Sequence, residues 1–124
     1  MAGRCAEKLI FEECSTGASN DIERATEISR EMVCSWGMSD KLGPLKFGSK
    51  SDSPFLGKQL SGATSDYSQA TAQQVDEEMK KIITEAQTTA TEILSYRIHI
   101  LRAMAQVLIE KETINGEEVR KMLN

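Results

Sequence analysis

The sequence predicts a mainly α-helical protein, a helix bundle with at most a short strand near residues 45–47. Apolar residues recur at intervals of three and four positions along most of the chain, which is the spacing of a helix face that packs on a core. Candidate helix starts and stops flank these stretches. The 124 residues are 40% hydrophobic and 27% charged, which are ordinary proportions for a globular domain able to bury a core.

The first part of the chain, residues 1–47, is expected to hold two helices and the loop between them. A short helix is predicted over residues 2–11, and residues 14–20 are rich in turn-forming and helix-capping residues. A second helix is predicted to start at Asn20, because Asn20 can cap it and Glu23 three positions later completes a capping box. Gly37 supplies its C-terminal stop. The apolar stripe of this helix consists of Ile22, Ala25, Ile28, Met32, Val33 and Trp36.

The remaining chain divides into a loop and a helical half. Residues 48–66 are rich in Gly, Ser and Asp and predict a long flexible loop. Residues 67–124 predict a helical hairpin, followed by a short terminal helix that starts at Asn115 with Glu118 three positions on. We expect the three parts to belong to one single-domain fragment.

Charge and residue counts exclude several functional classes. The net charge is −4 and no basic block occurs, so no nucleic acid partner is expected. The single histidine, His99, excludes a zinc site built from two histidines of this chain. Three widely spaced cysteines do not suggest a disulfide framework. No apolar run is long enough to span a bilayer, and no Walker loop is present to bind ATP.

An ordered series of short motifs resembles the C-terminal part of the peptidase domain of the FtsH family. The most specific is STGASNDI, residues 15–22, and the others follow it or precede it in the family's order. They are GRCAE at 3–7, ERAT at 23–26, WGMS at 36–39, KLGP at 41–44, FLGK at 55–58, VDEE at 75–78 and LIEKETI at 108–114. Each motif alone is weak, but the ordered set covers essentially the whole chain.

The resemblance implies a function for a longer protein. FtsH-family members are membrane-anchored, ATP-dependent zinc metalloendopeptidases of the AAA class. They act as homohexamers in quality control, degrading unfolded and membrane proteins at the cytoplasmic face of the bacterial inner membrane or at an organelle membrane. The His-Glu-x-x-His helix, which carries the Glu general base, is expected upstream of residue 1. The ATPase module and the membrane helices are expected further upstream.

The resemblance also implies one metal ligand in this chain. The family's zinc is held by the two His of that helix and by an Asp of the Thr-Gly-Ala-Ser-Asn-Asp loop, which maps to Asp21. Catalytic zinc typically has three protein ligands and one open position for water. The supporting loop consists of Thr16, Gly17, Ala18, Ser19 and Asn20. No catalytic residue is expected in the chain itself, so the 124 residues alone are expected to be inactive.

Two alternatives stay open at this stage. Asp21 also fits an ordinary first-turn residue that complements the helix dipole. The whole chain also fits a non-catalytic helical interaction module or a degenerate paralogue. It departs from the family in having Glu12 after the aromatic Phe11, where Gly is frequent, and in lacking an aromatic residue near Ala86 and Gln87.

Overall fold

The computed structural model describes residues 1–48 and 67–124, and within them the fold is mainly α-helical, as predicted. The helices are α1 (Ala2–Phe11), the short 3₁₀ helix η1 (Thr16–Ala18), α2 (Ser19–Cys34), α4 (Gln69–Tyr96), α5 (Ile98–Lys111) and α6 (Gly116–Leu123). These two ranges contain no strand, and residues 45–47 are irregular. The predicted loop from residue 49 onward and the FLGK motif lie outside the described residues. None of the described helices is long and apolar enough to cross a membrane.

The contacts divide the chain into two compact units. One unit combines Met1–Ala18 with Ala86–Asn124, and the other is Ser19–Glu85. Helix α4 contributes its first part to the second unit and its last part to the first. The single domain expected from the sequence stays a prediction.

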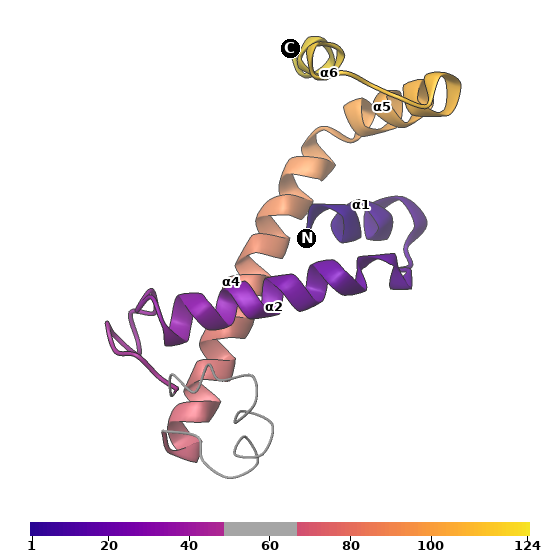
Figure 1. Ribbon diagram of the computed structural model, residues 1–124. Coiled ribbons are helices and arrows are strands. Elements are labelled where there is room, and N and C mark those ends of the chain that lie inside the picture. The colour runs from indigo at the N-terminus through magenta and orange to yellow at the C-terminus, as the bar shows by residue number, and fades with distance from the viewer. Residues whose placement is uncertain (49–66) are drawn as a thin grey trace, which may run out of the picture. The chain divides into compact units, whose positions relative to one another are not determined.

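The unit of residues 19–85 is built on a small core between α2 and the first part of α4. Val33 and Cys34 of α2 pack with Val75 and Met79 of α4. Figure 1 shows the ribbons of α2 and α4 crossing each other. The two valines are 0% and 1% exposed. Partly buried apolar side chains surround this core, namely Leu42, Phe47 and Ile82.

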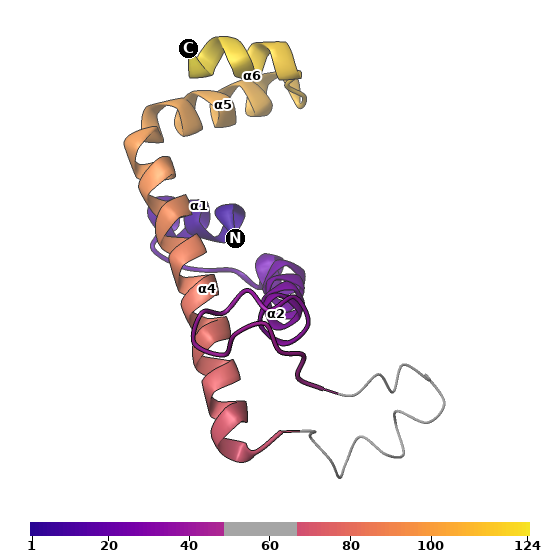
Figure 2. The same ribbon diagram turned by 90° about the vertical axis from the view of Figure 1, so that its left-hand side faces the viewer.

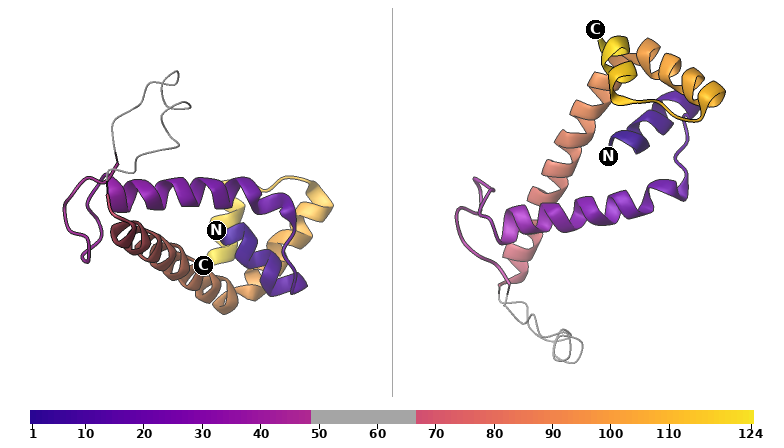
Figure 3. Two further views of the ribbon diagram at one scale, coloured as in Figure 1. Left: turned by 90° about the horizontal axis from the view of Figure 1, so that it is seen from below. Right: turned by 45° about the horizontal axis from the view of Figure 1, so that its top comes forward.

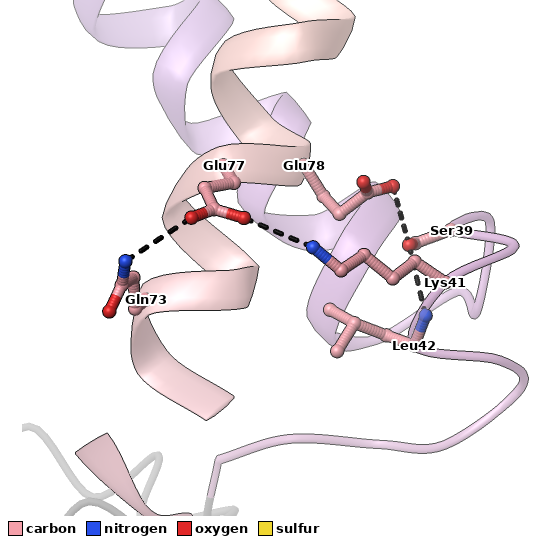
Figure 4. Close-up of polar contacts among 6 residues, drawn as sticks. All are labelled: Ser39, Lys41, Leu42, Gln73, Glu77 and Glu78. Atoms are coloured by element: carbon pink, nitrogen blue, oxygen red, sulfur yellow. Dashed lines mark hydrogen bonds and ion pairs between the residues drawn. The ribbon is translucent and has the colours of Figure 1, made fainter. Parts of the chain in front are cut away.

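The segment after α2 is fastened to α4 by side-chain hydrogen bonds (Figure 4). The buried Ser39 donates from Oγ to Glu78 Oε2 at 2.7 Å and accepts from the N–H of Leu42 at 3.2 Å. Lys41 Nζ pairs with Glu77 Oε2 at 3.0 Å, and this bond lowers the pKa of Glu77 below its ordinary value. The segment is therefore held by the α4 surface as well as by the core.

Two expectations about α2 are wrong. The helix begins at Ser19 directly after η1, so Asn20 lies in the first turn and the Asn20–Glu23 capping box does not form the start. The predicted stripe is also only partly covered, since Ile22, Ile28 and Trp36 are 40%, 44% and 56% exposed. Gly37, in contrast, has the left-handed conformation (φ 64°) expected of a helix stop.

In the other unit, α1 lies against the last part of α4, as Figure 2 shows. The buried Cys5 donates from Sγ to the carbonyl of Gln87 at 3.7 Å. Further along, α5 and α6 pack side by side (Figure 3), and Lys111 Nζ pairs with Glu118 Oε1 at 3.3 Å. The two helices that pair closely in this half are therefore α5 and α6, while α4 and α5 are separated only by Arg97.

Helix α1 ends on a residue whose conformation suits glycine. Glu12 is the C-cap with φ 60°, and Glu112 ends α5 in the same way with φ 64°. This left-handed geometry favours glycine at both positions. We expect Glu12→Gly and Glu112→Gly each to raise the free energy of unfolding, by about 0.5 to 1 kcal/mol. Thermal unfolding of the two variants would measure this, and a loss of stability in either would contradict it.

The start of α6 confirms the capping box predicted at Asn115. The side chain of Asn115 accepts from the N–H of Glu118 at 2.9 Å, and Glu118 Oε2 accepts from the N–H of Asn115 at 3.1 Å. We expect Asn115→Ala to cost about 1 kcal/mol of stability, because an orphan helix N–H loses its acceptor. Asn115→Asp keeps an acceptor there and should retain most of the stability in the same unfolding experiment.

The same box makes the stability of α6 depend on pH. The hydrogen bond from the N–H of Asn115, aided by Lys111, lowers the pKa of Glu118 below its ordinary value. A group whose pKa is lower in the folded state stabilises the fold above its unfolded pKa, which is about 4.3 for Glu. This contribution is lost as pH falls below that range. The protection factors of the α6 amides, taken relative to the intrinsic exchange rate at each pH, should therefore fall on acidification more in the wild type than in Glu118→Gln.

Candidate metal-ligand loop

The loop that leads to Asp21 is short and closely turned. Helix α1 ends at Phe11, the 3₁₀ turn η1 covers Thr16–Ala18, and α2 follows immediately at Ser19. This order places Asp21 in the first turn of α2, with an exposed side chain. A carboxylate at this place is accessible to a metal ion from outside the chain.

The five supporting residues differ in burial. Ala18 is 6% exposed and anchors the turn, whereas Thr16, Gly17, Ser19 and Asn20 are exposed. The N–H of Gly17 donates to Ser15 Oγ at 3.2 Å. A Cβ at Gly17 would meet the same oxygen at 3.2 Å, a tight contact, so glycine lets the turn close on Ser15.

Glu7 on α1 ties this loop to the preceding helix. Ser15 donates from Oγ to Glu7 Oε1 at 2.7 Å, so Glu7, Ser15 and the N–H of Gly17 form one hydrogen-bonded chain. The second oxygen, Glu7 Oε2, is buried and has no hydrogen-bond partner within the part of the chain that the structure describes. A buried carboxylate oxygen without a donor is costly. Glu7 therefore has one acceptor position open.

The contact of Glu7 with this loop is not predicted by the sequence. The only signal was its place in the GRCAE motif, which precedes the loop in the ordered series. Its relation to Ser15 is a tertiary contact between a helix and a loop, so neither spacing nor periodicity points to it.

The groove beside Glu7 measures about 300 Å³ and is lined by Glu7, Phe11, Glu13, Cys14 and Ser15.

Asp21 is the one residue of the predicted zinc site that lies in the chain. Over residues 1–48 and 67–124, no group of three or more His, Cys, Asp and Glu side chains gathers to hold a metal ion. His99 lies exposed in the first turn of α5. All three cysteines are free, and burial raises the pKa of the Cys34 thiol. A single carboxylate fits the role of one oxygen ligand to a zinc whose other ligands come from elsewhere.

Comparison with known proteins gives matches along the whole chain. A family model described as peptidase family M41 matches residues 1–122. The chain is 50% identical over 123 residues to the ATP-dependent zinc metalloprotease FtsH of Pseudothermotoga lettingae, covering 99% of this chain and 20% of that protein. It is 45% identical over 124 residues to the protein of the same name from Thermotoga maritima, covering 100% of this chain and 20% of that protein. The chain thus spans about a fifth of the length of these curated relatives.

Proposed function

Because the chain belongs to peptidase family M41, we propose that it forms the C-terminal part of the peptidase domain of an ATP-dependent zinc metalloendopeptidase. The observation that carries this proposal is the match over residues 1–122 together with the place of the STGASNDI motif. That motif runs from Ser15 through η1 into the first turn of α2, where the exposed carboxylate of Asp21 lies.

In the proposed site, Asp21 is the zinc ligand supplied by this chain. Bound zinc lowers the pKa of its water toward about 7 and so provides the nucleophile for peptide hydrolysis. In the residues before α2, η1 covers Thr16–Ala18 and the bond from Gly17 to Ser15 closes the turn. Glu7 fixes Ser15 from the side of α1. Neither a general base nor a leaving-group acid is assigned to this chain.

The wider properties follow from the resemblance and belong to the same proposal. The two His ligands and the Glu base are supplied by an upstream part of the same polypeptide, and ATP is bound by an upstream module. The complete protein is a membrane-anchored homohexamer that degrades unfolded and membrane proteins at the cytoplasmic face of the bacterial inner membrane, or at an organelle membrane. The exposed apolar side chains of this chain, such as Tyr96 at 83% and Ile109 at 76%, are suited to contacts in such an assembly.

The direct experiment compares the complete protein with the isolated 124 residues. We expect the complete protein to hydrolyse casein when zinc and ATP are present, to lose this activity with a chelator, and to regain it with added zinc. The isolated chain should show none, because it lacks two of the three metal ligands and the base. Zinc-dependent casein hydrolysis by the isolated chain would overturn the proposal, and inactivity of the complete protein would favour the interaction module.

A further inference from the structure

A single residue breaks the long helix of the C-terminal half. Helix α4 ends at Tyr96 and α5 begins at Ile98, so only Arg97 lies between them. Arg97 has φ −113° and ψ 29°, outside the helical range, and its side chain makes no capping hydrogen bond. Its N–H donates to the carbonyl of Ile93 at 3.2 Å, and the N–H of Leu101 donates to the carbonyl of Arg97 at 3.1 Å. Helical hydrogen bonds therefore extend to Arg97 from the α4 side and resume at Arg97 on the α5 side.

Nothing in the local sequence requires this break. Sharp kinks in helices are ordinarily caused by Pro, by Gly, by a π-bulge or by a group inserted into the hydrogen-bond ladder. Residues 92–101 read EILSYRIHIL, which contains neither Gly nor Pro and is compatible with an uninterrupted helix. In that form the N–H groups of Ile98 and His99 would bond the carbonyls of Leu94 and Ser95.

The bend is not held by a buried core. Neither α5 nor α6 has a buried side chain. The two helices pack on each other and are linked by the Lys111–Glu118 ion pair, so they would move together. On the α4 side, Leu123 shares with Ile93 and Tyr96 an open groove of about 560 Å³. Straightening the chain therefore sacrifices little apolar burial, and elements with few buried contacts are those that move.

We propose that Arg97 is a hinge at which the chain interconverts between the broken form and an uninterrupted helix from Gln69 to Lys111, with α5 and α6 moving as one body. This device goes beyond the proposed zinc site and does not depend on it. Its effect is to change where the α5–α6 pair lies relative to the last part of α4.

The hinge is tested by distances between spin labels in the complete protein, with labelled copies diluted into unlabelled ones. The labels are placed at the exposed positions Ala86→Cys and Ala105→Cys, and the exposed Cys14 is replaced by Ser. An uninterrupted helix separates the two positions by about 28 Å along its axis, and the broken form gives a shorter distance. We expect both distances in the wild-type background.

A proline variant identifies the longer distance. Ile98 is the first residue of α5, a position where proline is tolerated, but in the uninterrupted helix the same position is interior and proline breaks it. Ile98→Pro should reduce the population at the longer distance by about a hundredfold. Ile98→Ala removes the same side chain without affecting the backbone and should keep both distances. A single distance in the wild type, or a longer distance that survives in Ile98→Pro, would overturn the hinge.

Discussion

Replacing Asp21 by alanine in the complete protein is expected to remove bound zinc and to abolish peptide hydrolysis. The proposed site has three protein ligands. If one is lost, the two that remain no longer fix the position of the metal. Loss of an outer partner of a ligand already lowers affinity or activity by about 10- to 100-fold, so loss of the ligand itself should exceed that range. Zinc content by mass spectrometry and casein hydrolysis measure the two effects.

A matched pair of variants separates ligation from helix stability. Glu27→Ala removes another exposed carboxylate of α2, outside the loop, and should leave zinc content and hydrolysis unchanged. Asp21→Asn keeps the size of the side chain but replaces the anionic ligand, so it should lose zinc, while the metal-free protein should lose only the helix-dipole contribution of about 0.3 to 1 kcal/mol. Full zinc content in Asp21→Ala would leave Asp21 with only the structural role of a first-turn acidic residue.

The largest loss of stability is expected for Gly37→Ala. Gly37 has φ 64°, and a Cβ there would lie 2.7 Å from the backbone Cα of Pro44, an atom that cannot rotate away. The left-handed conformation costs a non-glycine residue about 1 to 2 kcal/mol. Overpacking adds about 1 to 3 kcal/mol. We therefore expect thermal or urea unfolding to show a loss of about 2 to 5 kcal/mol.

Gly43→Ala is the control for the steric part of this effect. Gly43 has φ 72° but no atom within 4 Å of an added Cβ, so the variant suffers only the conformational cost. The difference between the two variants measures the contact with Pro44. Equal losses would show that the close packing between Gly37 and Pro44 contributes nothing.

The sequence could predict those features that local chemistry determines. The first helix matches its predicted range of residues 2–11, and the box at Asn115 and the stop at Gly37 form where their residue types indicate. The start of α2 could not be placed correctly, because the helix begins at Ser19 directly after the turn η1, so that Asn20 already lies within its first turn. Cap signals that stand next to one another in a loop do not decide which of them is used.

The covered and uncovered faces could not be predicted from periodicity. Ile22 and Ile28 follow the helical spacing of a core-facing stripe, yet both are exposed in this chain. Helical periodicity shows which face of a helix is apolar, but it does not show which part of the protein packs on that face. These residues fit a surface that packs against other parts of a longer protein.

The candidate site was predictable only through the resemblance. Asp21 alone is an exposed acidic residue at a helix start, a common arrangement with a purely structural explanation. The contact between Glu7 and Ser15 could be found only in the structure, because it depends on the packing of α1 beside the loop. The open acceptor at Glu7 Oε2 belongs to the same network and was invisible in the sequence.

The most direct test of the central claim is a crystal structure of the complete protein with anomalous diffraction recorded at the zinc edge. The anomalous peak locates the metal independently of any assumed ligand. We predict a zinc position about 2.0 to 2.2 Å from a carboxylate oxygen of Asp21, with nitrogen ligands from two histidines that lie outside this chain. A zinc peak coordinated without Asp21 would contradict the claim that this chain supplies the third ligand.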